Sequence, residues 1–247
     1  MNSFVYALLA VSVVSLVSLI GVVTLSMKEA NIRKFSVFFV SFAVGALFGD
    51  VFIHLIPELY KIGAEEFTPF FILGGILFFL ILEKFLHWRH CHVTDTHDHI
   101  HPMVASNLIG DAFHNFLDGL LIASSFAVSP TVGLATTIAV FLHEIPQELG
   151  DFGVMIHSGM KVKKALILNL LSALVSILGV FAFLVLGNFV TGIEKFILPL
   201  TIGGFIYIAG SDLVPELKHE ENFKTSIAHL IPLILGILIM YSFTLFE

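Results

Sequence analysis

The sequence predicts an all-α, polytopic membrane protein with eight transmembrane helices. Of its 247 residues, 57% are hydrophobic and only 13% are charged, and the mean hydropathy is +0.98. A typical soluble domain has about a quarter of its residues charged. Apolar stretches of the roughly 20 residues that a helix needs to cross a bilayer follow one another along the chain. These observations predict a single transmembrane domain over residues 1–247, with no second, soluble domain.

Eight segments have the length and composition of a spanning helix. In chain order they are 2–27, 35–57, 67–86, 102–128, 130–157, 165–190, 194–214 and 226–246. The first has no charge between Asn2 and Met27 and lacks the basic start and cleavage signal of a signal peptide, so we expect it to be retained. Ser129 and Pro130 separate the fourth from the fifth. The short connections predict an antiparallel helix bundle.

The basic residues of the loops predict the orientation of the bundle. If the N-terminus lies outside, only Lys61 and Lys195 lie on the outer side. The other ten lie on the inner side: Lys28, Arg33, Lys34, Lys84, Arg89, Lys161, Lys163, Lys164, Lys218 and Lys224. Lysine and arginine accumulate in cytoplasmic loops. The bias therefore predicts that both termini face out.

Two similar strings occur at residues 49–59 (GDVFIHLIPEL) and 210–217 (GSDLVPEL). They belong to the second and seventh predicted helices, which run in opposite directions through the membrane. Equivalent segments at opposite membrane faces are typical of an inverted repeat, and such repeats are found in transporters with a site near the bilayer midplane. The strings therefore predict an inverted-repeat bundle.

The fourth and fifth predicted helices each carry a polar stripe at bilayer depth. On the fourth, the polar residues at helical spacing are Asp111, His114, Asn115 and Asp118. On the fifth they are His143, Glu144, Gln147, Glu148 and Asp151. Ionisable side chains inside a membrane are costly and usually functional. Pro146 breaks the backbone hydrogen bonding within the second stripe, as happens where a helix lines a cavity.

The donor types in these stripes predict a site for a divalent transition metal. A carboxylate in lipid has to be paired, protonated or bound to a cation. Imidazole and carboxylate together suit Zn²⁺, Fe²⁺ or Mn²⁺, whereas Ca²⁺ and Mg²⁺ prefer all-oxygen ligand shells. We expect Zn²⁺ as a transported substrate, with Fe²⁺, Mn²⁺ and Cd²⁺ as alternatives. An interhelical polar network that only holds the bundle together is the structural alternative.

Further polar residues predict a path to and from this site. Asp50, His54 and Glu58 follow one face of the outer half of the second helix and are candidates for an entrance. Asp212 and Glu216 lie at the inner end of the seventh helix, as an exit would. On the central helices, Asp111, Glu148 and Asp151 extend the path. Anchoring at the membrane interface, or capping, remains the alternative role for these path residues.

A histidine-rich loop is predicted between the third and fourth helices, over residues 87–101. Six of the chain's 12 histidines lie there: His87, His90, His92, His97, His99 and His101. Such tracts bind metal weakly and flexibly, and the charge bias makes this loop cytoplasmic. A merely solvated loop is the alternative. The single cysteine, Cys91, excludes an internal disulfide and a thiolate cluster.

These motifs resemble the Zrt/Irt-like (ZIP) family of divalent-metal transporters. Residues 143–151 (HEIPQELGD) are similar to the HExPHExGD string on the fifth helix of one branch of that family. Residues 114–119 (HNFLDG) resemble the signature of its fourth helix, and residues 49–57 resemble its second helix. The similarity extends over all eight predicted helices.

The resemblance implies an eight-helix fold with both termini outside, and import of metal into the cytoplasm. It also implies a paired metal site, carried here by His114, Asn115, Asp118, His143, Glu144 and Gln147. Gln147 departs from the pattern, because this branch has His at that position and other branches often have Glu. A neutral carboxamide is a poor zinc ligand, which places the second metal position in question.

Two other functions are alternatives to metal import. His143, Glu144 and Gln147 come within one residue of the HExxH helix of zinc proteases. Gln147 removes the second histidine of that motif, and Pro146 bends the helix between its ligands, so we expect no enzyme. A metal exporter or a non-transporting sensor is the other alternative. The expected partners are divalent metal ions and the lipid bilayer, not nucleic acid, with the chain a monomer or a homodimer in the plasma (inner) membrane.

Overall fold

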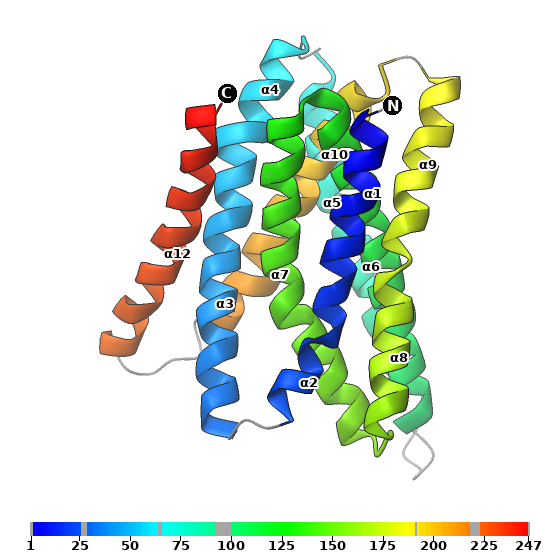
Figure 1. The fold of residues 1–247 in the computed structure, drawn as a ribbon, viewed down its shortest axis with the longest axis vertical. Coiled ribbons are helices and arrows are strands. Elements are labelled where there is room, and N and C mark those ends of the chain that lie inside the picture. The colour runs from blue at the N-terminus through cyan, green and yellow to red at the C-terminus, as the bar shows by residue number, and fades with distance from the viewer. Residues whose placement is uncertain are drawn as a thin grey trace.

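The computed structural model describes residues 2–25, 29–63, 66–91, 100–190, 192–217 and 223–246, and these residues form a bundle of long helices without strands (Figure 1). The helices are α1 (Asn2–Ser15), η1 (Leu16–Ile20), α2 (Gly21–Thr24), α3 (Glu29–Gly49), η2 (Asp50–Leu55), α4 (Ile56–Lys61), α5 (Thr68–Cys91), α6 (Ile100–Val128), α7 (Pro130–His157), α8 (Val162–Ala173), α9 (Ser176–Phe189), α10 (Glu194–Tyr207), η3 (Ile208–Leu213), α11 (Val214–Leu217), α12 (Phe223–Phe243) and η4 (Thr244–Phe246). Each predicted segment coincides with one helix or with consecutive helices, so the all-α class is confirmed.

Three helical stretches in the described part of the chain are long and apolar enough to cross a membrane. They are Ser3–Val23, Val37–Lys61 and Val162–Phe189. Shorter apolar helices lie at Thr68–Leu82 and His229–Phe243. Figure 1 shows both ends of the chain at the same end of the bundle.

α7 lies in the middle of the bundle and positions the polar stripe of the fifth predicted segment. It packs against α6, α3, α1 and η1, and α8. Around it, α3 pairs with α12, α5 with α10, and α6 with α9. Figure 1 shows α7 flanked by α3 on one side and α1 on the other. The side chains that α7 directs at α6 are therefore enclosed by helices and not by lipid.

Glycines allow the backbones of these outer pairs to approach closely. A Cβ atom on Gly119 of α6 would collide with the carbonyl oxygen of Ser176, and one on Gly179 of α9 would collide with that of Phe116. The same reciprocal arrangement joins α5 to α10 through Gly75 and Gly203, and α3 to α12 through Gly45 and Gly236. Membrane helices lack a hydrophobic driving force for association, so small residues that permit close packing stabilise their contacts.

The two similar strings share an uncommon backbone structure. Each lies on a six-residue π-helix, η2 or η3, followed by a short α-helix with proline at its second position. The N–H of Ile56 donates to the carbonyl of Val51, and that of Val214 donates to the carbonyl of Ala209, five residues back in both cases. Proline removes the next donor, and a π-turn accommodates the loss.

The two strings also point to opposite ends of the bundle. α10, η3 and α11 follow one another directly and form one continuous helical rod. This rod begins beside α4, and its last helix, α11, contacts α3. α3, η2 and α4 form a second continuous rod. Its last helix, α4, lies at the end of the bundle where the two ends of the chain also lie (Figure 1). η2 and η3 therefore occupy equivalent places in two runs of helices that point in opposite directions, and the inverted repeat itself stays a prediction.

The close contact between α6 and α9 can be tested with matched glycine variants. We expect Gly119→Ala to lower the free energy of unfolding by about 1–3 kcal/mol or more, because the added methyl group meets backbone and has no space to enter. Gly153→Ala is the control, since a Cβ atom there would meet nothing within 4 Å. Thermal unfolding of the purified protein in detergent would measure both. Equal melting temperatures for the two variants would contradict the packing.

Candidate metal centre

The turn between α6 and α7 fixes which residues of the two polar stripes face each other. Ser129 has extended backbone angles, and its hydroxyl accepts a hydrogen bond of 3.2 Å from the N–H of Val132. Pro130 occupies the first turn of α7, where its missing N–H costs nothing. α6 therefore ends and α7 begins within one residue, so the helices run antiparallel and side by side.

Four predicted ligands meet at one point between these helices, and we call them the histidine cluster: His114, Asp118, His143 and Glu144. One possible ligand atom from each lies within 4.8 Å of the others. The two Nε2 atoms of the histidines are 3.2 Å apart. His143 Nε2 lies 3.3 Å from Asp118 Oδ2 and 3.6 Å from Glu144 Oε1. Asp118, His143 and Glu144 are each 1% exposed, so water does not surround this cluster.

Three carboxylate oxygens of the cluster lack a hydrogen-bond partner in the described part of the chain, whereas the two imidazole Nε2 atoms lie within hydrogen-bond distance of each other. Nδ1 of His143 lies 3.2 Å from the carbonyl of Ala139, which can only accept, so Nδ1 carries the proton. Nε2 is then the ring nitrogen that faces the other residues of the cluster. Among the described residues, both oxygens of Asp118 and Oε1 of Glu144 are buried without a hydrogen-bond partner. Buried carboxylates in this state are expensive, and a divalent cation among the four side chains would compensate them.

A second group of possible ligands, the carboxylate cluster, adjoins the first: Asp111, Glu144 and Glu148. Its three ligand atoms also lie within 4.8 Å of one another, and all three residues are buried. Oδ2 of Asp111 and Oε2 of Glu148 have no hydrogen-bond partner in the described part of the chain. Glu144 belongs to both clusters. The sequence predicted Asp111 and Glu148 for the path only. Helical spacing could have joined them to the site, because Asp111 lies one turn before His114 and Glu148 lies one turn after Glu144.

The two carboxamides predicted as ligands both contact Asp111. Asn115 donates from Nδ2 to Asp111 Oδ1 at 3.0 Å, and Gln147 donates from Nε2 to the same oxygen at 3.2 Å. Asn115 also donates to the carbonyl of Asp111 at 3.2 Å. These bonds engage one oxygen of Asp111, and the other oxygen is buried without a hydrogen-bond partner among the described residues. The structure therefore gives both residues an orienting contact, and their roles as ligands stay predictions.

Polar contacts continue along α7 on both sides of the clusters. Towards the start of the helix, Thr136 donates to Asp50 Oδ2 at 2.9 Å, and both residues are fully buried. Towards its end, Asn107 donates to Asp151 Oδ1 at 2.8 Å. Thr136 and Asp151 are 15 residues apart, about 22 Å of helix. We call this stretch, from the Asp50 contact to the Asp151 contact, the polar track.

The other predicted entrance residues make contacts away from the clusters. The ring of His54 is buried, and its Nε2 lies 2.8 Å from the carbonyl of Met240 on α12. Glu58 forms an ion pair of 2.9 Å with Lys61, whose side chain is 61% exposed, so this pair lies at the surface. Asp50 contacts α7 on the polar track through Thr136.

The remaining predicted residues are described in part or not at all. Asp212 lies in η3 and Glu216 in α11, but their side chains fall outside the described residues. The histidine-rich segment is more helical than predicted, because α5 continues to Cys91 and α6 begins at Ile100. The backbones of His87, His90 and His101 are therefore helical. His92, His97 and His99 lie outside the described residues.

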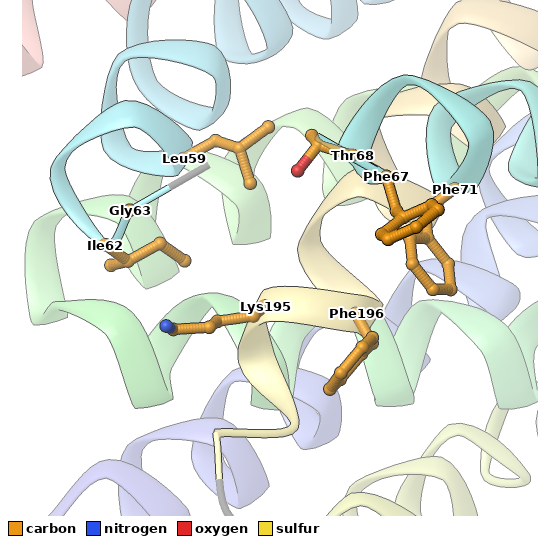
Figure 2. A pocket seen from close by; sticks show the side chains of 8 residues that line it. All are labelled: Leu59, Ile62, Gly63, Phe67, Thr68, Phe71, Lys195 and Phe196. Carbon is orange, nitrogen blue, oxygen red and sulfur yellow. The ribbon is translucent and has the colours of Figure 1, made fainter. Parts of the chain in front are cut away.

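Figure 2 shows a pocket that lies apart from the clusters, between the end of α4 and the beginnings of α5 and α10. Most of its lining is apolar, including Phe67, Phe71 and Phe196, and Lys195 extends along one side. Its volume of about 10 Å³ is at the lower limit for one water molecule. None of the predicted ligands lines it, so this pocket does not enlarge the candidate site.

A bundle of apolar helices that encloses histidines and carboxylates at its centre defines the class of membrane proteins that handle metal ions. The model of the ZIP zinc transporter family matches residues 2–105 and 89–244 of the chain. The chain belongs to this family. The predicted membership of the ZIP family is thereby confirmed. Because this is a family of transporters, membership argues against the metalloprotease alternative.

Curated relatives are similar over much of the chain. The zinc transporter ZIP13 of Pongo abelii is 36% identical over 83% of this chain and 66% of its own length. The zinc transporter ZIP4 of Mus musculus is 28% identical over 99% of this chain and 48% of its own length. The zinc transporter zipt-7.1 of Caenorhabditis briggsae is 29% identical over 99% of this chain and 80% of its own length. The chain thus spans only about half to two thirds of the first two of these relatives.

Replacing Gln147 tests its contact with Asp111. We expect Gln147→Glu to lower the melting temperature of the metal-free protein, because a donor to Asp111 becomes a second buried carboxylate. The same variant should show a larger rise in melting temperature on adding Zn²⁺, because a cation relieves that repulsion. The change in zinc affinity should be about tenfold or more, the scale on which groups around a metal alter binding. Thermal unfolding with and without Zn²⁺ measures both effects.

The control is Gln147→Met, which removes the donor without adding charge and should show no increase in the zinc-induced shift. If Gln147→Glu and Gln147→Met behave alike, Gln147 does not face the carboxylate cluster.

Proposed function

We propose that the chain transports divalent transition-metal cations across a membrane, most specifically Zn²⁺ into the cytoplasm. The observation that carries this proposal is the histidine cluster, where two imidazoles and two carboxylates converge in a buried place without hydrogen-bond partners for three carboxylate oxygens. Two nitrogen and two oxygen donors form a ligand set that suits tetrahedral Zn²⁺. The names of the relatives, as zinc transporters, agree with this substrate.

The proposed substrates also include Fe²⁺, Mn²⁺ and Cd²⁺. Mixed imidazole and carboxylate donors accept several divalent transition metals, and affinity alone does not separate them sharply. The carboxylate cluster offers only oxygen atoms and favours harder ions than the histidine cluster does. An ion such as Mn²⁺ is therefore expected to compete better at the carboxylate cluster than at the histidine cluster.

We propose that the two clusters are successive positions for the transported ion. An ion that arrives near Asp50 would meet the histidine cluster about two helical turns further along α7. Glu144, which belongs to both clusters, can bind an ion in the first while its neighbour Glu148 offers the next position. Asp151 continues the polar track from there. Asp212 and Glu216 remain the proposed exit, as the sequence predicts.

The proposed topology has eight spans, an inverted repeat and both termini outside. It is supported by the eight helical rods, by both chain ends lying together, and by the two π-helices in oppositely directed rods. The excess of lysine and arginine in the connections predicted to lie inside supports an orientation with both termini outside. Import rests on the family resemblance, and location in the plasma (inner) membrane and a homodimer are further parts of the proposal.

Transport is tested by removing one imidazole from the histidine cluster. We expect His143→Ala to reduce zinc uptake into proteoliposomes at least about tenfold, because losing one ligand weakens binding by more than about 1.4 kcal/mol. His229→Ala is the matched control, since His229 lies on α12, which carries none of the cluster residues. Imposing the zinc gradient in each direction distinguishes import from export. Normal uptake by a folded His143→Ala protein would refute the proposal.

The carboxylate cluster is tested separately by Glu148→Gln. This change preserves shape and removes one negative charge from the carboxylate cluster only. We expect the zinc stoichiometry of the purified protein to fall from two to one and uptake to slow severalfold, while the histidine cluster keeps its ion. Calorimetry with metal analysis would measure stoichiometry. Two ions bound to the Glu148→Gln variant with unchanged affinity would contradict a position at this cluster.

A further inference from the structure

We propose that a groove between α8 and η1 binds an anionic phospholipid of the leaflet at which α8 begins. The groove has a volume of about 480 Å³ and is separate from the metal clusters. Its lining residues are Leu19, Val162, Lys163, Leu166, Ile167 and Leu170. Apart from Lys163 every one of them is aliphatic, so the groove matches a hydrocarbon chain with one charged group at its end.

The geometry of α8 orders the charge and the apolar surface as a lipid does. Leu166, Ile167 and Leu170 follow Lys163 by three, four and seven residues, so all four share one face of the helix. The apolar residues extend about 5–10 Å along the helix axis from Lys163. A headgroup beside Lys163 would therefore continue into an acyl chain lying against the three aliphatic side chains.

The surroundings of this groove are those of a lipid-facing surface. Val162–Phe189 is long and apolar enough to cross a membrane, and only 28% of its most hydrophobic window is buried. The corresponding values are 44% and 67% for the other two such stretches. Ile167 is 48% exposed and Leu171 is 56% exposed. In a bilayer this face is covered by lipid, which decides the class of occupant.

The charge at the beginning of α8 selects an anionic lipid over a neutral one. Lys161, Lys163 and Lys164 are all exposed, and none of the three ammonium groups forms an ion pair with a described residue. α8 itself contains no acidic residue. On the adjacent α7, the carboxylate of Asp151 already accepts a hydrogen bond from Asn107. Among the described residues, therefore, nothing compensates the positive charge of these lysines at the end of the groove.

These lysines are not placed to stabilise their own helix. The N-terminus of a helix carries a partial positive charge and favours acidic residues, so lysines in the first turn oppose it. Their long alkyl stems instead allow the ammonium groups to reach the level of lipid headgroups. Near an anionic leaflet each lysine contributes about 1 kcal/mol of attraction, which corresponds to about fivefold in affinity. The first turn of α8 is thus unfavourable for an isolated helix and favourable beside a phosphate.

Native mass spectrometry of the full chain in detergent tests the proposal. The probes are phosphatidylglycerol and phosphatidylcholine with identical acyl chains. We expect the wild-type protein to retain phosphatidylglycerol preferentially over phosphatidylcholine. In the Lys163→Gln/Lys164→Gln variant, the ratio of the two retained lipids should fall about fivefold for each lysine removed. Lys61→Gln/Lys195→Gln, which removes the same charge at the other end of the bundle, should keep the preference.

Two further measurements separate the groove from general electrostatic attraction. Ile167→Trp fills the apolar part and leaves the lysines intact, so it should weaken retention of both lipids. Soluble glycerol phosphate, which has the headgroup chemistry without acyl chains, should not displace the bound lipid at equal concentration. Displacement by glycerol phosphate, equal binding of the two lipids, or equal losses for the two double lysine variants would overturn the proposal. Zinc-induced shifts in melting temperature would show that each variant is folded.

Discussion

The structure depends on the cost of enclosing carboxylates inside a bundle of apolar helices. Asp118 and Glu144 lie between α6 and α7 with oxygens that no described hydrogen bond satisfies. In a low-dielectric interior such groups destabilise the fold unless a cation or a proton compensates them. A bundle selected only for stability would replace them with leucine. Carboxylates in facing positions, together with two imidazoles, are what the proposed passage of a divalent cation through this place would require.

Close packing around α6 holds this costly arrangement in register. The Ser129 turn determines which residues of α6 and α7 face one another, and the Gly119–Gly179 contact fixes α6 against α9. With backbone against backbone, a shift of α6 along its axis would separate the ligand atoms of the histidine cluster. The distances of 3.2–3.7 Å among those atoms thus rest on glycines that carry no chemistry themselves.

Sequence reasoning found the helices and the four residues that the structure brings together between α6 and α7, because both follow simple rules. The eight apolar segments predicted the helical rods, and helical spacing predicted that His114 and Asp118 face His143 and Glu144. Sequence could not decide the direction of each hydrogen bond. Asn115 and Gln147 have both donors and an acceptor, and only the packed helices show that each directs its amide group to Asp111. The π-helices were also unforeseen, because proline marks a disturbed backbone without specifying how neighbouring bonds rearrange.

The neutral side chain at position 147 has an explanation in the charge of the two clusters taken together. They contain four carboxylates, those of Asp111, Asp118, Glu144 and Glu148. Two divalent cations would supply as many positive charges as these four carboxylates can carry negative ones. A glutamate at 147 would add a further negative charge beside Asp111 in a buried place. Gln147 keeps a contact to Asp111 without that cost. The departure from the family's pattern is therefore compatible with two metal positions, since Asp111 and Glu148 supply the carboxylates that residue 147 does not.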